Sequence, residues 1–553
     1  MRDRTGNTDT ASVSVTVTPT NDPPQMDAID NQEVAQGTLL SFAVSASDPD
    51  TPPDAWTFEL VPGAPAGASI GSTTGRFTWI PSEEHSPGTY EVTVRVSDNG
   101  VPAGSDEKTF SVRVVDMIDL GILDFTEPAR LEAGTLLYYR LSTMHTAWLT
   151  MEGLSGEHPA DLQLQLYRHD PQQPNSMGLL TTSALSENGS RLDWLASEGD
   201  EYYARASNPN AEFGIRIANL VRYNEQEKSA YVHGTAANDA FLFKAMTSAS
   251  ITINEVDYSF DRSDLNAVTF DGSSGVDAAI VYGTDDDEFF VCHPGSAVFS
   301  NTAQDVGFTV EIANTENIYG YGSAGNDTVE FYDSPQNDKL LGRLESNFSK
   351  MRSPGFVNRA DSFETVLADF SSGGRKDSAV TWDSEQDDEF GGSPGNLYFR
   401  AASGSEIVVV DADFVIARST NGGNDSLLLE DSTGDDVFRA RPHKAEVFDR
   451  KTRGRAYHVT ARAFEEAAAY AEQGGRDIAK LYDTALDDLW SAEYRDGGTW
   501  STIETEARTL YEVIAFEQVK GYGVLGGKNT LENRTHDNEL DFVIKYGDWK
   551  ELY

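Results

Sequence analysis

The stretch Gly325-Asn-Asp-Thr-Val-Glu-Phe-Tyr-Asp-Ser-Pro-Gln-Asn-Asp-Lys-Leu340 carries the pattern that decides the fold of the second half of the chain. A glycine-rich approach leads to an aspartate, a short strand-like run follows, and a second acidic turn closes the pattern. The first aspartate recurs at intervals of 50, 50, 48 and 52 residues, at Asp277, Asp327, Asp377, Asp425 and Asp477. A constant period of this length predicts one small structural unit that is copied several times.

The second acidic turn follows these periodic aspartates at an almost constant distance. It lies 10 residues after Asp277, at Asp287, and 11 residues after each of the other four. A degraded copy begins upstream at Ser229, and another reaches Asn529, the site equivalent to the periodic aspartate. Because insertions are almost absent, we assign residues 226–553 to one repeat region.

The run after each periodic aspartate has the alternation of a strand. Its second and fourth positions are mostly apolar and share one face, whereas its third position varies freely, as a solvent-facing position does. A further inward position is expected two residues after the second acidic turn, at Phe289, Leu340, Phe390, Phe438 and Trp490. Each unit has little core of its own, so neighbouring units must stack to bury these faces.

Two all-β architectures fit such stacking. In a β-solenoid, which we favour, each unit would form about two coils, and equivalent aspartates would lie roughly 10 Å apart along one edge. In a β-propeller, the alternative, each unit would form one four-stranded blade. The Gly-Asn-Asp and Gly-Asp-Asp turns, as in Gly423–Asp425, resemble the calcium-loaded turns of RTX-type parallel β-rolls, although the strict nine-residue period of that family is missing.

Stacked aspartates repel one another, and a hard cation would relieve that repulsion. Calcium is therefore a hypothesis for the cofactor of the repeat region. The candidate ligands are the turn residues Asp277, Asp287, Asp327, Asp338, Asp377, Asp388, Asp425 and Asp436. The alternative is that Asp and Asn are there only because they favour tight-turn conformations.

An aromatic row lies five positions after the periodic aspartates. Its members are Tyr282, Tyr332, Trp382, Glu430 and Tyr482, on the outward face by parity. We interpret the row as a cross-coil ladder that stiffens the stack. A strip on which sugars stack is the alternative.

Charge and composition restrict the function. With 42 basic and 90 acidic residues, the net charge of −48 excludes nucleic acid as a partner and disfavours anionic membrane surfaces. The single cysteine, Cys292, permits no intrachain disulfide. No apolar run approaches the ~20 residues of a membrane span. Residues 1–24 look like the last strand and linker of a preceding module, so we expect a longer polypeptide whose export signal lies upstream.

Residues 25–116 predict a β-sandwich, because short alternating strands are separated by turn signals. The Asn21-Asp-Pro-Pro24 linker, the Asp48-Pro-Asp50 turn and the Gly75–Pro81 hairpin resemble cadherin-like and immunoglobulin-like modules of large bacterial surface proteins. In calcium-binding cadherins such residues form an interdomain cage. The resemblance implies the candidate calcium ligands Asn21, Asp22, Glu33, Asp48 and Asp50. Simple turn capping is the alternative.

Residues 117–225 predict a second all-β unit. The strands Asp161–Tyr167 and Gly199–Ala206 resemble those of bacterial pre-peptidase C-terminal domains, which are small jelly-roll-like sandwiches. Such modules are accessory parts of secreted proteins.

These observations favour a non-enzymatic structural or adhesion protein, extracellular or at the cell surface. Its expected partners are other surface proteins or extracellular glycans. No nucleophile elbow, phosphate loop or histidine metal motif is present. The rival interpretations are a polysaccharide lyase or hydrolase and a carbohydrate-binding protein, each built on the solenoid. A clustered, non-repeating set of acidic and basic groups in one groove would favour a rival.

Overall fold

The computed structural model describes residues 4–6, 8, 10, 12–14, 20–50, 55–82, 84–132, 136–154, 161–170, 173–186, 189–246, 248–301, 307–452, 456–495, 498–506, 508–534 and 542–552. In this part of the chain the regular structure is β, apart from 3-10 structure at Arg262–Asp264 and at Asp161. The chain divides into two compact units, Met1–Asn219 and Leu220–Tyr553. The strand expected within residues 1–24 lies largely outside the described residues. No described helix is long and apolar enough to cross a membrane.

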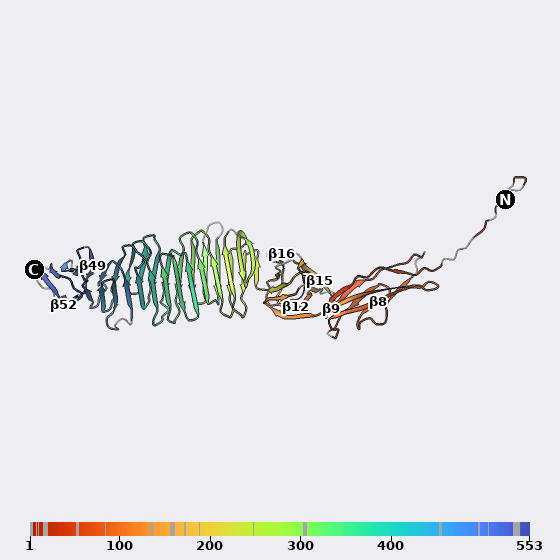
Figure 1. The fold of residues 1–553 in the computed structure, drawn as a ribbon, viewed down its shortest axis with the longest axis horizontal. Helices are drawn as coiled ribbons and strands as arrows, with labels where there is room; N and C mark the ends of the chain where they lie inside the picture. Colours follow the sequence, from red (N-terminus) through yellow and green to blue (C-terminus); the bar gives the residue numbers. More distant parts are fainter. Residues whose placement is uncertain are drawn as a thin grey trace. The chain divides into compact units, whose positions relative to one another are not determined.

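The first unit begins with the predicted sandwich. Its three-stranded sheet consists of β3 (Leu40–Ala43), β7 (Arg76–Trp79) and β6 (Ser69–Ile70), and β1 (Gln25–Met26) pairs with β4 (Ala46–Ser47). The facing sheet has four strands, β2 (Gln32–Ala35), β9 (Ser105–Val115), β8 (Gly88–Asp98) and β5 (Trp56–Leu60) (Figure 1). Strict alternation along β8 buries Val92, Val94 and Val96 against Phe77 and Trp79.

A second sandwich completes this unit with two five-stranded sheets. One contains β10 (Met117–Leu123), β12 (Leu136–Thr143), β18 (Glu201–Ser207), β14 (Gln163–Asp170) and β15 (Gln173–Thr182). The other contains β11 (Phe125–Leu131), β19 (Phe213–Ala218), β13 (Trp148–Leu154), β17 (Gly189–Leu195) and β16 (Ala184–Ser186). Leu149, Leu164 and Tyr202 lie in the core between them.

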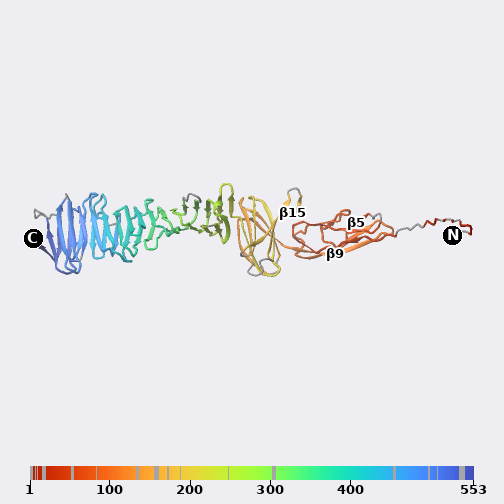
Figure 2. The same ribbon diagram turned by 90° about the horizontal axis from the view of Figure 1, so that it is seen from above.

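The second unit is a β-solenoid of two long sheets whose strands lie side by side along it (Figures 1 and 2). The 16-stranded sheet contains β24 (Val256–Asp261), β23 (Ser248–Ile253), β22 (Ala240–Ala245), β26 (Ala278–Tyr282), β30 (Asn317–Tyr321), β34 (Phe356–Asp361), β33 (Phe348–Ser353), β32 (Lys339–Arg343), β36 (Ser378–Trp382), β40 (Phe414–Arg418), β44 (His458–Arg462), β43 (Lys444–Asp449), β42 (Asp436–Arg441), β46 (Ile478–Tyr482), β50 (Gln518–Gly523) and β52 (Val543–Gly547).

The 18-stranded sheet faces it and contains β20 (Val221–Asn224), β21 (Ser229–His233), β25 (Ala267–Asp271), β27 (Glu288–His293), β28 (Ser296–Asn301), β29 (Phe308–Ala313), β31 (Thr328–Tyr332), β35 (Thr365–Asp369), β37 (Asp388–Ser393), β38 (Asn396–Ala401), β39 (Glu406–Val410), β41 (Ser426–Glu430), β45 (Glu466–Tyr470), β47 (Leu489–Arg495), β48 (Gly498–Glu504), β49 (Thr509–Ile514), β51 (Asn529–Asn533) and β53 (Trp549–Leu552). Successive units pair in parallel through continuous sheets, so the solenoid is confirmed and the propeller alternative is wrong.

Each unit passes from sheet to sheet three times before the next unit begins. The unit of Asp327, for example, runs through β31, crosses to the antiparallel hairpins β32, β33 and β34, and returns through β35 before β36 opens the next unit on the opposite sheet. Three crossings are an odd number, so consecutive periodic aspartates fall on opposite edges. The expected single row along one edge, with two coils per unit, is therefore wrong. Asp277, Asp377 and Asp477 form one row, and Asp327, Asp425 and Asn529 form the other.

The predicted strand faces are confirmed. The second and fourth residues after each periodic aspartate are buried, as with Val329 and Phe331. One inward position is corrected, because Phe289 is 41% exposed and its neighbour Phe290 is buried. Glu288, not Asp287, opens β27, so the spacing from Asp277 is the same 11 residues as in the other units.

The outward aromatic row forms a ladder, as predicted. Tyr282 stacks on Tyr321 with ring centroids 4.7 Å apart, and Tyr522 stacks between Tyr482 and Tyr546 at 4.4 and 4.7 Å. Trp382 lies between two guanidinium groups, those of Arg343 and Arg418, at 5.2 and 5.5 Å. Rings and cations on successive coils thus cover one another along the outer face.

Candidate metal centres at the corners of the solenoid

Each unit turns its main corner with the pattern Ser/Thr-x-x-x-Asp/Glu. At Ser334–Asp338 the Ser334 N–H and hydroxyl both donate to the Asp338 carboxylate, at 3.2 and 2.9 Å, and Gln336 N–H donates to the Ser334 hydroxyl. The carboxylate thus closes the turn, because it accepts hydrogen bonds from the N–H and the hydroxyl of the serine four residues before it. The same bonds recur at the acidic residues Asp239, Glu288, Asp388, Asp436 and Asp488.

Carboxylates also tie neighbouring coils together. The N–H of Asp338 donates to Asp377 Oδ1 at 2.7 Å, and the N–H of Asp377 donates to Asp413 at 3.1 Å. Equivalent bonds join Asp239, Asp277 and Glu316; Glu288, Asp327 and Glu364; Asp388, Asp425 and Glu465; and Asp436, Asp477 and Glu517. The carboxylate of each periodic aspartate thus accepts a backbone hydrogen bond from the coil before it. Its backbone N–H donates to an acidic side chain on the coil after it.

Glycine shapes the approach to these corners. Gly275, Gly325, Gly423, Gly475 and Gly527 lie two residues before a periodic site, all with positive φ. A Cβ at Gly475 would lie 1.9 Å from the Gly434 carbonyl oxygen on the neighbouring coil. The glycine therefore lets two coils approach closely, besides adopting a conformation that other residues avoid.

Two corners bring three buried carboxylates together, with one oxygen of each within 4.8 Å of the others. We call them the 333 triad (Asp333, Asp338 and Asp377) and the 431 triad (Asp431, Asp436 and Asp477). Every member is at most 4% exposed. Both triads lie on the edge that carries Asp277, Asp377 and Asp477. No other group of three acidic or histidine side chains in the described part of the chain is as close.

Each triad contains a buried carboxylate oxygen that accepts no hydrogen bond. Asp333 Oδ1 accepts from Ser372 N–H at 2.9 Å, but its Oδ2 has no partner. Asp477 Oδ1 accepts from Asp436 N–H at 2.7 Å, and its Oδ2 has none. A buried anionic oxygen without a donor is costly, so it requires a proton or a cation.

The pKa values of the corner aspartates reflect the same cost of burying a negative charge. Burial raises the pKa of Asp477 to about 7, and the charges of Glu517, Asp436 and Asp431 contribute to the increase. Burial likewise raises the pKa of Asp338, Asp377 and Asp436. On the other edge, burial with the charges of Glu288 and Glu364 raises the pKa of Asp327 to about 7.

Three other corners depart from the triads in their side chains. Gly283 replaces the first acid beside Glu288 and Asp327. Asn529 replaces the periodic aspartate beside Asp483, and its amide donates to Asp483 Oδ2 at 3.0 Å. In the corner of Asp383 and Asp388, the hydroxyl of Ser419 donates to Asp425. Neutral donors also meet triad carboxylates, since the hydroxyls of Tyr457 and Ser432 donate to Asp436 and that of Ser334 donates to Asp338.

The predicted metal ligands of the repeat region divide between these corners. Asp338, Asp377 and Asp436 lie in triads, whereas Asp277, Asp327, Asp388 and Asp425 lie at corners outside them. Asp287 is exposed, and its Oδ1 accepts the N–H of Asn326 at 2.8 Å.

Sequence reasoning missed Asp333, Asp431 and Asp477 as triad members. A signal was present, because an aspartate follows four periodic aspartates by six residues, at Asp333, Asp383, Asp431 and Asp483, whereas Gly283 takes that place after Asp277.

Four of the five candidate ligands of the first sandwich take part in hydrogen bonds with one another or with Asp98. Asp50 accepts the N–H of Asp22 at 3.0 Å and donates its own N–H to Asp48 at 2.9 Å. Asn21 donates to Asp98 at 3.0 Å. Glu33 instead pairs with Arg113 and Arg205, each at 3.4 Å.

Comparisons with known proteins identify one module. Residues 18–115 match the family model described as "Putative Ig domain". No curated protein matches the chain. The first sandwich is therefore immunoglobulin-like, in agreement with the predicted fold.

Among solved structures, a nucleoside hydrolase-related hypothetical protein from Saccharophagus degradans is 21% identical, with a TM-score of 0.15, and the match covers 17% of this chain and 26% of that one. Human cadherin-23 EC21-23 is 26% identical, with a TM-score of 0.16, over 21% of this chain and 43% of that one. Mouse cadherin-23 EC22-24 is 13% identical, with a TM-score of 0.15, over 63% and 99%. The chain thus spans less than half of the first two proteins, and no functional argument rests on these similarities.

Proposed function

We propose that this chain is the spacer and adhesion region of a secreted or cell-surface protein, without enzymatic activity, and that calcium stabilises its solenoid. The immunoglobulin-like sandwich supports the surface location, since such modules are common in extracellular proteins. The observation that carries the proposal is that the repeated residues all serve contacts between coils. Its inward apolar residues, glycines, corner acids and aromatic ladder all hold one coil to the next, which is the arrangement expected of a structural scaffold.

The donor sets of the 333 and 431 triads fit calcium. Calcium prefers six to eight oxygen ligands, and carboxylates are its commonest charged ligands in proteins. Asp333 Oδ2 and Asp477 Oδ2 are buried without a donor, as a ligand oxygen would be. Asp338 and Asp377 would complete the first set, and Asp431 and Asp436 the second. Bound calcium would supply the positive charge that three buried carboxylates otherwise lack.

Thermal unfolding of the whole chain in calcium and in chelator tests this proposal. A ligand present at 100 times its dissociation constant stabilises the folded state by about 2.7 kcal/mol per site. Two occupied triads should therefore raise the midpoint of the solenoid transition by several degrees, whereas magnesium, which demands octahedral geometry and retains its waters, should have a smaller effect. Identical transitions in calcium and chelator would overturn the calcium assignment.

A further inference from the structure

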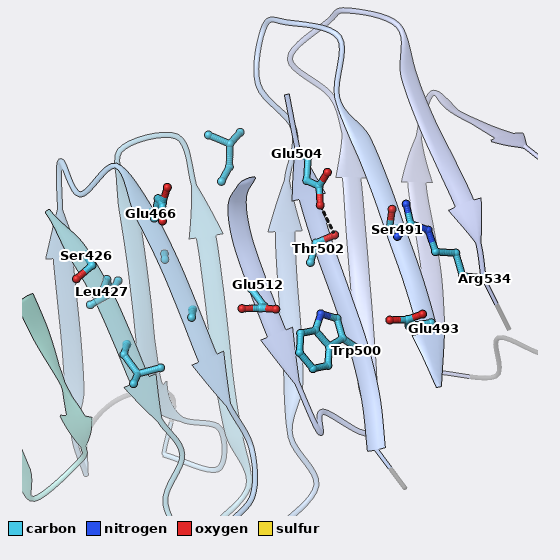
Figure 3. A pocket seen from close by; sticks show the side chains of 14 residues that line it. Ser426, Leu427, Glu466, Ser491, Glu493, Trp500, Thr502, Glu504, Glu512 and Arg534 are labelled. Carbon is cyan, nitrogen blue, oxygen red and sulfur yellow. Dashed lines mark hydrogen bonds between the residues drawn. The ribbon is translucent and has the colours of Figure 1, made fainter. Parts of the chain in front are cut away.

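A groove with a volume of about 580 Å³ lies on the outer face of the 18-stranded sheet, near the end of the solenoid (Figure 3). Strands β41, β45, β49, β48 and β47 contribute to it, and Arg534 lies beside it just after β51. These strands are neighbours by their hydrogen-bonded pairings. These five strands span four strand spacings, or roughly 19 Å.

The side chains across the strands explain why the surface is hollow. One lateral row runs through Leu428, Ala468, Glu512, Thr502 and Ser491. Alanine, threonine and serine fill three of these positions, so the surface is low on both sides of Glu512. Trp500 lies in the next row, opposite Glu493.

The groove departs from the repeat that governs the rest of the solenoid. In the two equivalent hairpins, the residues at the position of Trp500 are Ser296 and Asn396. Strands β47 and β48 have seven residues each, whereas β27, β28, β37 and β38 have six. Packing of the stack therefore does not require a tryptophan here. Among the three equivalent hairpins of this sheet, only this one has a large aromatic side chain at the position.

The groove combines an aromatic ring with many hydrogen-bond acceptors. Glu466, Glu493, Glu504 and Glu512 line it together with Ser426 and Thr502. Thr502 donates to Glu504 at 3.2 Å. Arg534 is the one cation among the lining residues, and it pairs with Glu532 at 2.7 Å.

We propose that this groove binds a neutral oligosaccharide chain, with sugar rings against Trp500 and sugar hydroxyls donating to the glutamates. Four carboxylates against one guanidinium repel uronic acids and other anionic sugars. An indole offers a flat apolar face, which suits the apolar face of a sugar ring. The length of the groove favours several linked sugars over a single one. This inference names a ligand class for the proposed adhesion role and rests on that role.

Isothermal titration of the full chain with neutral hexasaccharides tests the proposal. The probes are the β-1,4-linked hexamers of glucose, mannose and N-acetylglucosamine, with hexagalacturonate as the anionic comparison and a hexalysine peptide as the cationic one. We expect at least one neutral hexamer to bind and hexagalacturonate to show no heat of binding. Trp500→Ala should weaken binding by about tenfold or more, as loss of a central aromatic contact does.

Two further variants keep the test informative. Trp382→Ala removes an outward tryptophan from the other sheet, outside the groove, and should leave saccharide affinity unchanged. Arg534→Ala changes an exposed side chain and should weaken binding without unfolding the sheet. The proposal fails if no neutral hexamer binds, if Trp500→Ala binds as well as the parent chain, or if hexalysine alone binds. Each of these results leaves the calcium-dependent unfolding test untouched, so the two proposals fail separately.

Discussion

Asp477 and Asn529 occupy equivalent positions with different charges, and the pair suggests a direct test of the 431 triad. Asn529 donates its amide to Asp483, whereas Asp477 has a buried oxygen without a donor. Asp477→Asn should therefore stabilise the chain in chelator by about 1 to 3 kcal/mol, because a buried charge is removed. In calcium the same variant should lose about half of the metal-dependent stabilisation. Thermal unfolding under both conditions measures the two effects.

Asp425→Asn is the matched control for this variant. Asp425 lies on the other edge, outside the triads, and receives the hydroxyl of Ser419. Its replacement should leave the difference between calcium and chelator unchanged. An equal loss of calcium response in both variants would contradict the assignment of calcium to the 431 triad.

Gly475 is a position where backbone conformation and close packing act together. Its φ is +116°, and an added Cβ would meet the Gly434 carbonyl oxygen. Gly474 has a φ of +106° but no atom within 4 Å of such a Cβ. Gly474→Ala should cost about 1 to 3 kcal/mol through the strained backbone alone. Gly475→Ala should cost clearly more, because two coils must separate. Chemical denaturation of both variants compares them, and equal losses would show that the close approach is unimportant.

At the level of the corner element, Asp327 predicts a dependence of stability on pH. Its pKa in the folded chain is about 7, with Glu288 and Glu364 facing it, against about 3.9 for an unfolded aspartate. Between these values the folded state holds a proton that the unfolded state has lost, so stability falls as pH rises from about 4 to 7. From pH 5.5 to 7 the contribution of Asp327 to this loss should be about 2 kcal/mol, and Asp477, whose pKa is also raised to about 7, should add a similar amount. Denaturation in chelator at several pH values measures it, and Asp327→Asn should flatten the profile. If the dependence of stability on pH were identical in parent and variant, the proton would be bound by a group other than Asp327.

The corners also mark where sequence reasoning succeeds and where it stops. Alternation alone identified the buried faces, such as Val329 and Phe331, because a strand has only two faces. The acidic run Asp285–Glu288 permits two registers, and only the structure distinguishes them, through the burial of Phe290 and the hydrogen bond from Glu288 N–H to Asp327. The sheet on which each unit begins depends on the number of crossings, which no residue pattern records. The groove at Trp500 was missed because it belongs to one unit and has no period.

At the scale of the whole solenoid, the odd number of crossings makes successive units interchangeable. Every unit begins on the sheet opposite to its predecessor and contributes the same corner bonds to its neighbours. Removing residues 327–376 would join Asn326 to Asp377, preserve the Gly-Asn-Asp turn, and let Asp377 receive the N–H of Glu288 in place of Asp327. All later units would move to the opposite sheet together, so their mutual contacts would be unchanged.

This deletion should therefore fold, and it should retain only part of the calcium response. It removes Asp333 and Asp338 with the 333 triad, whereas the 431 triad lies entirely in later units. Circular dichroism should show an intact β spectrum, and the calcium-dependent rise of the midpoint should fall to about half. Deletion of residues 327–351 is the control, because it removes β31, β32 and four of the six residues of β33, and so destroys the hairpin. That variant should not fold. If the half-unit deletion folded as well as the whole-unit deletion, the corner bonds would not define the repeating element, since register between coils would then be free to slip.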